Sequence, residues 1–200
     1  MIYVGIDYSI NSPGIVVEPT DNYYLFFSVQ KKDNKCCRKL DMLNDVQIMV
    51  IEKEGMTDFE FVDKQTDIII RNIEEIQKLY KDNELCIGIE DYIYYSQQSS
   101  LIDIVQATTV LKYKIIKKWG EGVLNKYSPT HVKKTFAGNG RASKTDMLFA
   151  YNRLKKTNPF AQWCHKLSSE HKPEEDMIDS FAVLYTLKSE LTNELEKHNS

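Results

Sequence analysis

Four acidic residues occupy positions from which their side chains could act together on one reacting group. Asp7 and Glu90 each end a short apolar run, "IYVGID" and "LCIGIE", of the kind that forms a strand. Asp176 and Asp179 are three residues apart at the predicted start of a helix, so both lie on one side of it. Strand ends and helix starts collect at one edge of an α/β sheet, so the four carboxyl groups could converge there.

Convergence would have a chemical consequence, because carboxylates within about 4–6 Å of each other repel and raise each other's pKa unless a cation lies among them. Their oxygens suit Mg²⁺ or Mn²⁺, and two such ions about 4 Å apart can orient a water nucleophile and stabilise the leaving oxygen of a phosphodiester. Taken singly, Asp7 is equally explained as a turn residue, and Asp176 as a favourable charge at a helix N-terminus. Only the set of four indicates a metal site.

The apolar pattern predicts the elements that must position these acids. Residues 2–30 contain three runs rich in β-branched and aromatic side chains, which predict three strands of a meander. Residues 31–60 are polar, and we interpret them as an irregular excursion in which "VQIMVI" could form a strand. From Val62 the apolar residues recur every three or four positions, which is the spacing of one helix face, and the strand "LCIGIE" follows.

Helices and strands are predicted to alternate in the second half of the chain. Residues 99–119 predict a helix that is apolar on two sides, either a central core helix or one that also packs on a partner subunit. "GVLNKYSP" indicates a strand, and Ser143 with Asp146 forms a capping-box pattern for a helix that continues to about Lys156. A last helix begins near "PEEDMIDSF" and fades into a polar tail at residues 193–200.

The length of 200 residues suits one domain, which we place at residues 1–192. The order of elements predicts an α/β fold whose mixed sheet, an antiparallel meander followed by parallel strands, is flanked by helices. The N-terminus lacks a secretory pattern, and no apolar stretch approaches the roughly 20 residues of a membrane span. We therefore expect a cytoplasmic protein without membrane contact, and both a cellular and a viral origin fit the sequence.

The charges are distributed unevenly along the chain. From Lys112 to Lys172 there are 14 Lys and Arg against three acidic residues, a net charge of +11, whereas the rest of the chain carries −14. Such asymmetry is typical of a surface that binds a phosphate-rich partner. A set of solvated helix faces would give the same pattern, so both interpretations stay open.

Four blocks in this order resemble the successive motifs of RuvC-type Holliday-junction resolvases, which belong to the RNase H-like superfamily. The blocks are "GIDYS", "IGIEDYIYY" followed by a long apolar helix, "YSPTHVKKTFAGNGRASKTDM" and "DMIDSFAVLY". Together they cover most of residues 1–190. The third block is the most specific, because Lys133 and Lys144 lie eleven residues apart around a G-x-G, a spacing similar to that of the family's lysines near the active site.

The resemblance implies a role for each motif. It implies metal-dependent hydrolysis of four-way DNA junctions by a homodimer that pairs through helix 99–119, with Mg²⁺, or alternatively Mn²⁺, bound as two ions per site. The implied metal-binding catalytic acids are Asp7, Glu90, Asp176 and Asp179, with Lys144 as a further catalytic group. The residues expected to contact DNA are Lys133, Lys134, Arg141, Lys144, Tyr92 and Tyr94.

The sequence also departs from the family pattern. Tyr8 and Ser9 follow the first aspartate where the family commonly has Pro-Gly, and Ile93 stands where a base-stacking Phe often lies. The tyrosines beside Ile93 could replace that stacking group or could belong to the core or to a dimer contact. Three alternatives therefore remain: a nuclease of the same fold acting on flaps, forks or RNA–DNA hybrids; an ATP-binding protein of the actin and sugar-kinase superfamily; and a catalytically silent DNA-binding scaffold.

Overall fold

The structure, a computed structural model, describes the chain except residues 34, 81–82, 92–98, 155–172 and 199–200. In the described part, six strands form one sheet: β1 (Ile2–Asp7), β2 (Gly14–Thr20), β3 (Tyr23–Gln30), β4 (Val46–Val50), β5 (Leu85–Glu90) and β6 (Leu124–Tyr127). The described helices are α1 (Lys35–Leu40), α2 (Asp58–Leu79), α3 (Ser99–Trp119), α4 (Pro129–Ala137), α5 (Lys144–Arg153) and α7 (Glu174–His198), with a 3-10 turn, η1, at Glu121–Val123.

The sheet is mixed, with the strand order β4-β3-β2-β1-β5-β6. Strands β1, β2 and β3 are antiparallel neighbours, whereas β4, β5 and β6 each pair in parallel with the strand beside them. The predicted meander followed by parallel strands is thus confirmed, and so is the strand within "VQIMVI", which forms β4. The interpretation of residues 31–60 as irregular is wrong in part, because this segment also contains α1 and the start of α2.

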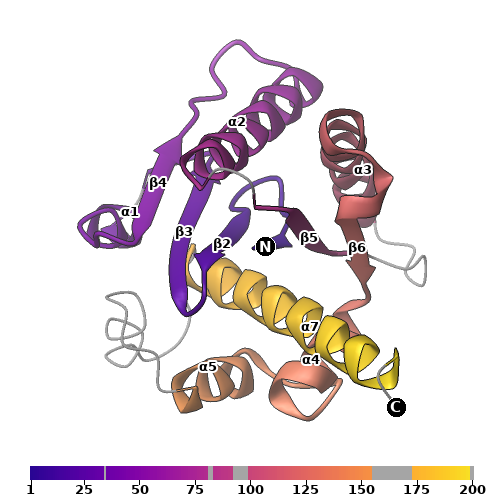
Figure 1. Cartoon of the computed structure of the whole chain (residues 1–200). Helices are drawn as coiled ribbons and strands as arrows, with labels where there is room; N and C mark the ends of the chain where they lie inside the picture. Colours follow the sequence, from indigo (N-terminus) through magenta and orange to yellow (C-terminus); the bar gives the residue numbers. More distant parts are fainter. Residues whose placement is uncertain (34, 81–82, 92–98, 155–172, 199–200) are drawn as a thin grey trace.

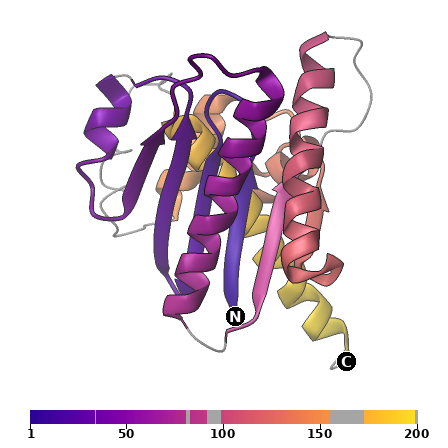
Figure 2. The ribbon, with the colours of Figure 1, turned by 90° about the horizontal axis from the view of Figure 1, so that it is seen from above.

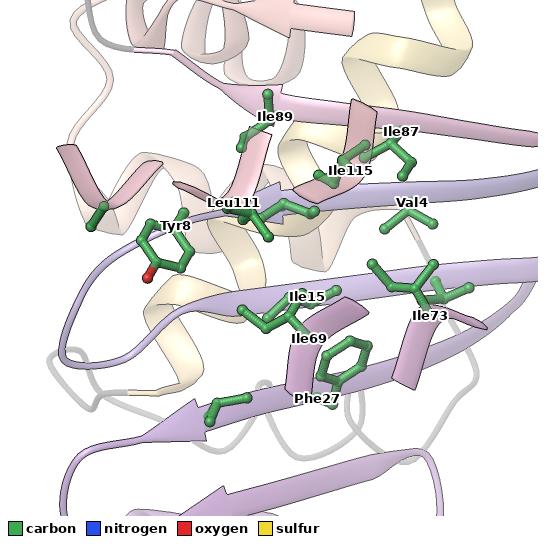
Figure 3. Close-up of a cluster of buried hydrophobic side chains, with 14 of the residues drawn as sticks. Val4, Tyr8, Ile15, Phe27, Ile69, Ile73, Ile87, Ile89, Leu111 and Ile115 are labelled. Carbon is green, nitrogen blue, oxygen red and sulfur yellow. The ribbon is translucent and has the colours of Figure 1, made fainter. Parts of the chain in front are cut away.

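Helices cover both faces of the sheet (Figures 1 and 2). Helices α2 and α3 lie side by side on one face, and α7 crosses the other face, where α4 and α5 pack against it. Along β1, Val4 and Ile6 point toward α2 and α3, whereas Gly5 is covered by α7, as the alternation of side chains in a strand requires. Figure 3 shows the apolar cluster on the α2 and α3 side.

Local sequence signals account for several helix boundaries. A capping box of Thr57 and Glu60 starts α2 at Asp58, a few residues before the point at which the apolar spacing changes. The predicted capping box at Ser143 is confirmed, since Ser143 and Asp146 each receive the other's backbone N–H, at 3.2 and 2.8 Å. Helix α4 opens on Pro129, which needs no hydrogen-bond acceptor there.

The last helix is longer than the sequence predicted. Helix α7 continues to His198, so the expected polar tail at residues 193–200 is helical over most of its length. Residues such as Leu195 and Lys197 are strong helix formers, so the helix extends although these side chains are exposed. No helix in the described ranges combines the length and apolar character needed to cross a membrane.

Helix α3 has one buried face and one half-covered face. Ala107, Leu111 and Ile115 are buried against the sheet. Val110 is half-buried at the margin of the same cluster, whereas Tyr113, on the opposite side of the helix, is 62% exposed. The structure therefore assigns one side of this helix to the core of the chain and leaves the opposite side accessible around Tyr113.

Candidate active site

Two of the four acids lie side by side because they end neighbouring parallel strands. The register of β1 and β5 pairs Ile6 with Ile89, so Asp7 and Glu90 are the next residues on both strands. Side chains alternate along a strand, and both acids lie two residues beyond a glycine that α7 covers. Both carboxyl groups therefore point to the α7 face, where Asp7 is only 7% exposed.

The other two acids reach this point because α7 begins against the ends of these strands. A Cβ atom on Gly5 would lie 2.2 Å from the Ser180 carbonyl oxygen, and one on Gly14 would lie 1.9 Å from that of Asp176. Glycine is therefore required at both positions for the helix backbone to approach this closely. The first turns of α7 then carry Asp176, which is buried, and Asp179 on one side of the helix.

The proximity of the four acids is visible in their electrostatics. Burial raises the pKa of Asp7 well above its ordinary value. Nearby negative charges raise it further, and these belong to Glu90, Asp179 and Asp176. Burial and the charge of Asp179 raise the pKa of Glu90 to about 7, against the opposing effect of a side-chain hydrogen bond with Asp7. The structure thus brings all four predicted acids into one cluster.

Lys144, the first residue of α5, places its ammonium group among these carboxylates. Its Nζ donates a hydrogen bond to Asp179 and lies 3.8 Å from Glu175 Oε2. Burial alone would lower the pKa of Lys144, but its acidic neighbours outweigh burial and raise it, chiefly Asp179, followed by Asp7 and Asp176. Lys144 is therefore the local counter-charge of the acidic cluster.

The chemistry of this donor set fits a divalent cation. Buried carboxylates that raise each other's pKa require positive charge, and their oxygens are hard ligands of the type that Mg²⁺ prefers. Among the residues that the structure describes, no three Asp, Glu, His or Cys side chains stand in metal-coordinating geometry. The ammonium group of Lys144, which donates a hydrogen bond to Asp179, provides positive charge at the cluster.

The predicted DNA-contacting residues have different surroundings. Lys133 on α4 is close enough to Glu90 to lower its pKa, so it lies beside the acids. Lys134 and Arg141 are exposed. Tyr92 and Tyr94 lie outside the described residues, so their predicted role stays a prediction.

Several lysines of the basic segment pair with acids of this chain, so fewer of its positive charges are available to a partner than the net charge of +11 indicated. Lys112 binds Asp91 at 2.9 Å, and Lys118 binds Glu74 at 2.7 Å. Lys114 binds two aspartates of α2 at 2.7 and 2.6 Å. These three lysines of α3 therefore form ion pairs that join α3 to α2 and to Asp91, the residue after β5. Lys144 likewise pairs with an acid of its own chain.

Sequence reasoning missed the glycines that admit α7 and the contact between Lys144 and Glu175. The signal for the glycines was present, because Gly5 and Gly88 each stand two residues before a strand-terminal acid. A glycine inside a strand often marks a place where another backbone approaches closely. The partner of Lys144 left no such signal, because it depends on how α5 and α7 pack.

The mixed sheet has the strand order β4-β3-β2-β1-β5-β6, and acids stand at the ends of β1 and β5 and in the first turns of the crossing helix α7. These features are those of an RNase H-like protein with a carboxylate cluster at the edge of its sheet. The chain belongs to the RuvC family, described as crossover junction endodeoxyribonuclease RuvC, which matches residues 35–183. Proteins of this family depend on divalent metal ions.

Relatives named crossover junction endodeoxyribonuclease RuvC are similar over part of the chain. That of Helicobacter pylori strain G27 is 30% identical over 118 residues, which cover 59% of this chain and 66% of the relative. That of Helicobacter hepaticus is 29% identical over 140 residues, covering 70% and 63%. The chain thus matches slightly less than two thirds of the length of these relatives.

Solved structures share the fold over almost the whole chain. Thermus thermophilus RuvC in complex with a Holliday junction substrate aligns with a TM-score of 0.57 at 15% identity, over 96% of each chain. The yeast mitochondrial Holliday junction resolvase aligns with a TM-score of 0.51 at 14% identity, over 92% of this chain and 76% of that one. At 14–15% sequence identity, this similarity is evidence for a shared fold alone.

Proposed function

We propose that this chain is a divalent-metal-dependent endonuclease that resolves four-way DNA junctions by hydrolysing phosphodiesters. The observation that carries the proposal is the acidic cluster at the ends of β1, β5 and the start of α7, within a chain of the RuvC family. A bound pair of Mg²⁺ or Mn²⁺ ions would supply Lewis-acid stabilisation of the transition state and activation of the attacking water.

The four acids have the role of holding these ions. Asp7 is buried at the end of β1, where its strand partner Gly14 lies against the first turn of α7, so its carboxylate would hold a metal ion from the inner side of the site. Glu90 and Asp179 are less buried, so their oxygens are accessible to a cation that would also contact a phosphate. Asp176 closes the site from the α7 side and is 3% exposed.

Lys144 and Lys133 would act on the DNA. The half-exposed side chain of Lys144 would contact a phosphate oxygen beside the cut once the charge of Asp179 is balanced by a bound cation. Lys133 lies near Glu90 on α4, which places a second positive charge at the same edge. Exposed Lys134 and Arg141 extend this basic surface for contacts with the phosphate backbone.

Replacing Lys144 with Ala tests this role. We expect the single-turnover cleavage rate at saturating Mg²⁺ to fall about 10²-fold, the usual cost of losing one stabiliser of developing charge. The salt dependence of junction binding, measured by fluorescence anisotropy, should weaken by about one phosphate contact. Lys39→Ala is the matched control, because Lys39 is an exposed lysine on α1, beside the opposite edge strand β4. If the Lys144→Ala protein cleaves at the parental rate, Lys144 has no role in catalysis.

A homodimer would provide two such sites for the two strands to be cut. We infer that the accessible side of α3 around Tyr113 is the contact between subunits, since an exposed aromatic side chain on the outer side of a helix is suited to a second copy. Two sites in one dimer predict paired, symmetric cuts.

The experiment that tests the proposed function is a substrate panel. The purified protein is incubated with a synthetic four-way junction, a linear duplex of the same sequence, a flap and a fork, each with Mg²⁺ and with EDTA. We expect symmetric paired nicks in the junction alone, and only with metal. Equal cutting of flaps and forks would replace the proposed substrate with branched DNA in general, and the absence of any cutting would overturn the nuclease assignment.

A further inference from the structure

The segment after Asp7 is held by a buried polar network on the far side of the sheet from the acidic cluster. Its centre is Gln65 on α2, which is fully buried within an otherwise apolar core. An amide in such a place is costly unless its hydrogen-bonding groups are satisfied. The partners of Gln65 therefore indicate what the residue is there to hold.

Those partners all belong to the edge of the sheet that carries the acids. Gln65 Oε1 accepts a hydrogen bond of 2.8 Å from the hydroxyl of Tyr8. Its Nε2 donates to the carbonyl oxygens of Ile10, at 3.1 Å, and Val29, at 2.8 Å. One side chain of α2 thus joins the turn after β1 to the end of β3.

Tyr8 is the neighbour of Asp7 in the sequence, so its contacts lie directly behind the acidic cluster. Consecutive residues in an extended chain point to opposite faces, so Asp7 enters the site while Tyr8 enters the core behind it. Tyr8 is 1% exposed, and Figure 3 shows it at the end of the apolar cluster. With its ring packed and its hydroxyl bound by Gln65, Tyr8 leaves little freedom to the backbone that carries the Asp7 carboxylate.

The second half of the same turn is also tied down. Gln30 Nε2 donates to Ser12 Oγ at 3.0 Å, and Ser28 Oγ donates to the Pro13 carbonyl oxygen. These contacts fix the chain just before Gly14, the strand partner of Asp7. The turn from Tyr8 to Pro13 is thus anchored at both ends, although its sequence is rich in small and polar residues.

We propose that Gln65 and Tyr8 are positioning residues for Asp7: the Gln65–Tyr8 hydrogen bond sets the orientation at which the Asp7 carboxylate meets a divalent metal ion. Neither side chain touches the metal or the DNA. The inference rests on the proposed metal-dependent function, and it predicts that the network controls metal affinity rather than DNA binding. Partners that orient metal ligands in this way are typically worth about 10–100-fold in metal affinity or activity.

The test compares two variants with a matched control in the same helix. Tyr8→Phe removes only the hydroxyl, and Gln65→Met removes the amide at nearly constant volume. Thr66→Val is the control, because Thr66 is as buried as Gln65 but its hydroxyl binds only Val62 and Asp63 within α2, at 2.8 and 2.9 Å. All three changes perturb buried hydrogen bonds around α2, and two of them break the connection to Asp7.

Two readouts separate positioning from a loss of stability. We expect Tyr8→Phe to raise the Mg²⁺ concentration for half-maximal single-turnover cleavage about tenfold, while junction affinity in EDTA stays within about twofold. The rise in melting temperature on adding Mg²⁺ without DNA should shrink for Tyr8→Phe and Gln65→Met and stay parental for Thr66→Val. Should Gln65→Met fail to fold, Tyr8→Phe alone decides the question.

The outcomes distinguish this inference from the proposed function. If Tyr8→Phe keeps the parental Mg²⁺ dependence in both readouts, the network is purely structural and the inference is wrong, whatever its melting temperature. If the parental protein gains stability from Mg²⁺ but cuts no junction, the proposed substrate fails while the thermal shift still decides on the network. If Mg²⁺ gives the parental protein neither stability nor cleavage, both are overturned.

Discussion

Asp7→Asn should abolish cleavage of a four-way junction while the protein still folds and binds the junction. The amide keeps the shape of the side chain but loses the charge that would bind the metal ions most closely. Losing several kcal/mol of charge stabilisation in the transition state lowers the rate about 10³-fold or more, at about 1.4 kcal/mol for each factor of ten. Single-turnover cleavage and an electrophoretic mobility-shift assay measure the two properties separately.

The same substitution should stabilise the metal-free protein. The pKa values of Asp7 and Glu90 are raised, so the folded protein holds these two protons more tightly than the unfolded chain does. The stability gained from this difference is fully present below about pH 4 and is lost as the pH rises through the folded-state pKa, about 7 for Glu90. At pH 8 in EDTA, Asp7→Asn removes one buried charge, and its unfolding free energy should exceed the parental value by about 1–3 kcal/mol. At pH 5 the difference should shrink, because the parental carboxyl groups retain a proton.

A matched control separates the site from a general effect of removing one negative charge. Asp21 is exposed in the turn between β2 and β3, which lies at the opposite end of β2 from Gly14. Asp21→Asn should leave both cleavage and the pH dependence of stability at the parental values. An Asp7→Asn protein that cuts the junction at the parental rate would remove the acidic cluster from catalysis and, with it, the proposed mechanism.

The sequence was sufficient to place the acids because their positions depend on local features. Asp7 and Glu90 end apolar runs that form strands, and parallel neighbours in a sheet bring their ends together. Asp176 and Asp179 required only the three-residue spacing of a helix face. The mixed sheet likewise followed from three consecutive strands and a later alternation of strands with helices.

Other features of the site depend on packing between distant segments, which no local pattern contains. The basic segment indicated a DNA-facing surface, but the partners of Lys112, Lys114 and Lys118 exist only because α3 lies beside α2 and the exit of β5. The departure at Tyr8 was visible in the sequence, whereas the hydrogen-bond partner of Tyr8, a residue 57 positions away, was not. In residues 31–60 the short apolar run of β4 was visible in the sequence, whereas the polar residues around it did not reveal α1 or the start of α2.

Gly14→Ala should disrupt the site without changing any charged group. Gly14 faces Asp7 across the β1–β2 ladder, and a Cβ atom there would lie 1.9 Å from the Asp176 carbonyl oxygen. Backbone atoms cannot rotate away from the new methyl group, so α7 must move. We expect a loss of about 3 kcal/mol or more, at the upper end of the cost of overpacking. The melting temperature should fall by about 6–12 °C, at about 2–4 °C for each kcal/mol.

Cleavage should fall with it, because a shift of about 1 Å between the Asp7 and Asp176 carboxylates costs on the order of 10²-fold in rate. Gly122→Ala is the control, since a Cβ atom at Gly122 meets nothing within 4 Å. Single-turnover rates are measured at a temperature where calorimetry shows every variant to be folded. A Gly14→Ala protein that is destabilised but cuts at the parental rate would mean that α7 can move without carrying Asp176 out of the site. The glycine would then serve the packing of α7 on the sheet and not the geometry of the acids.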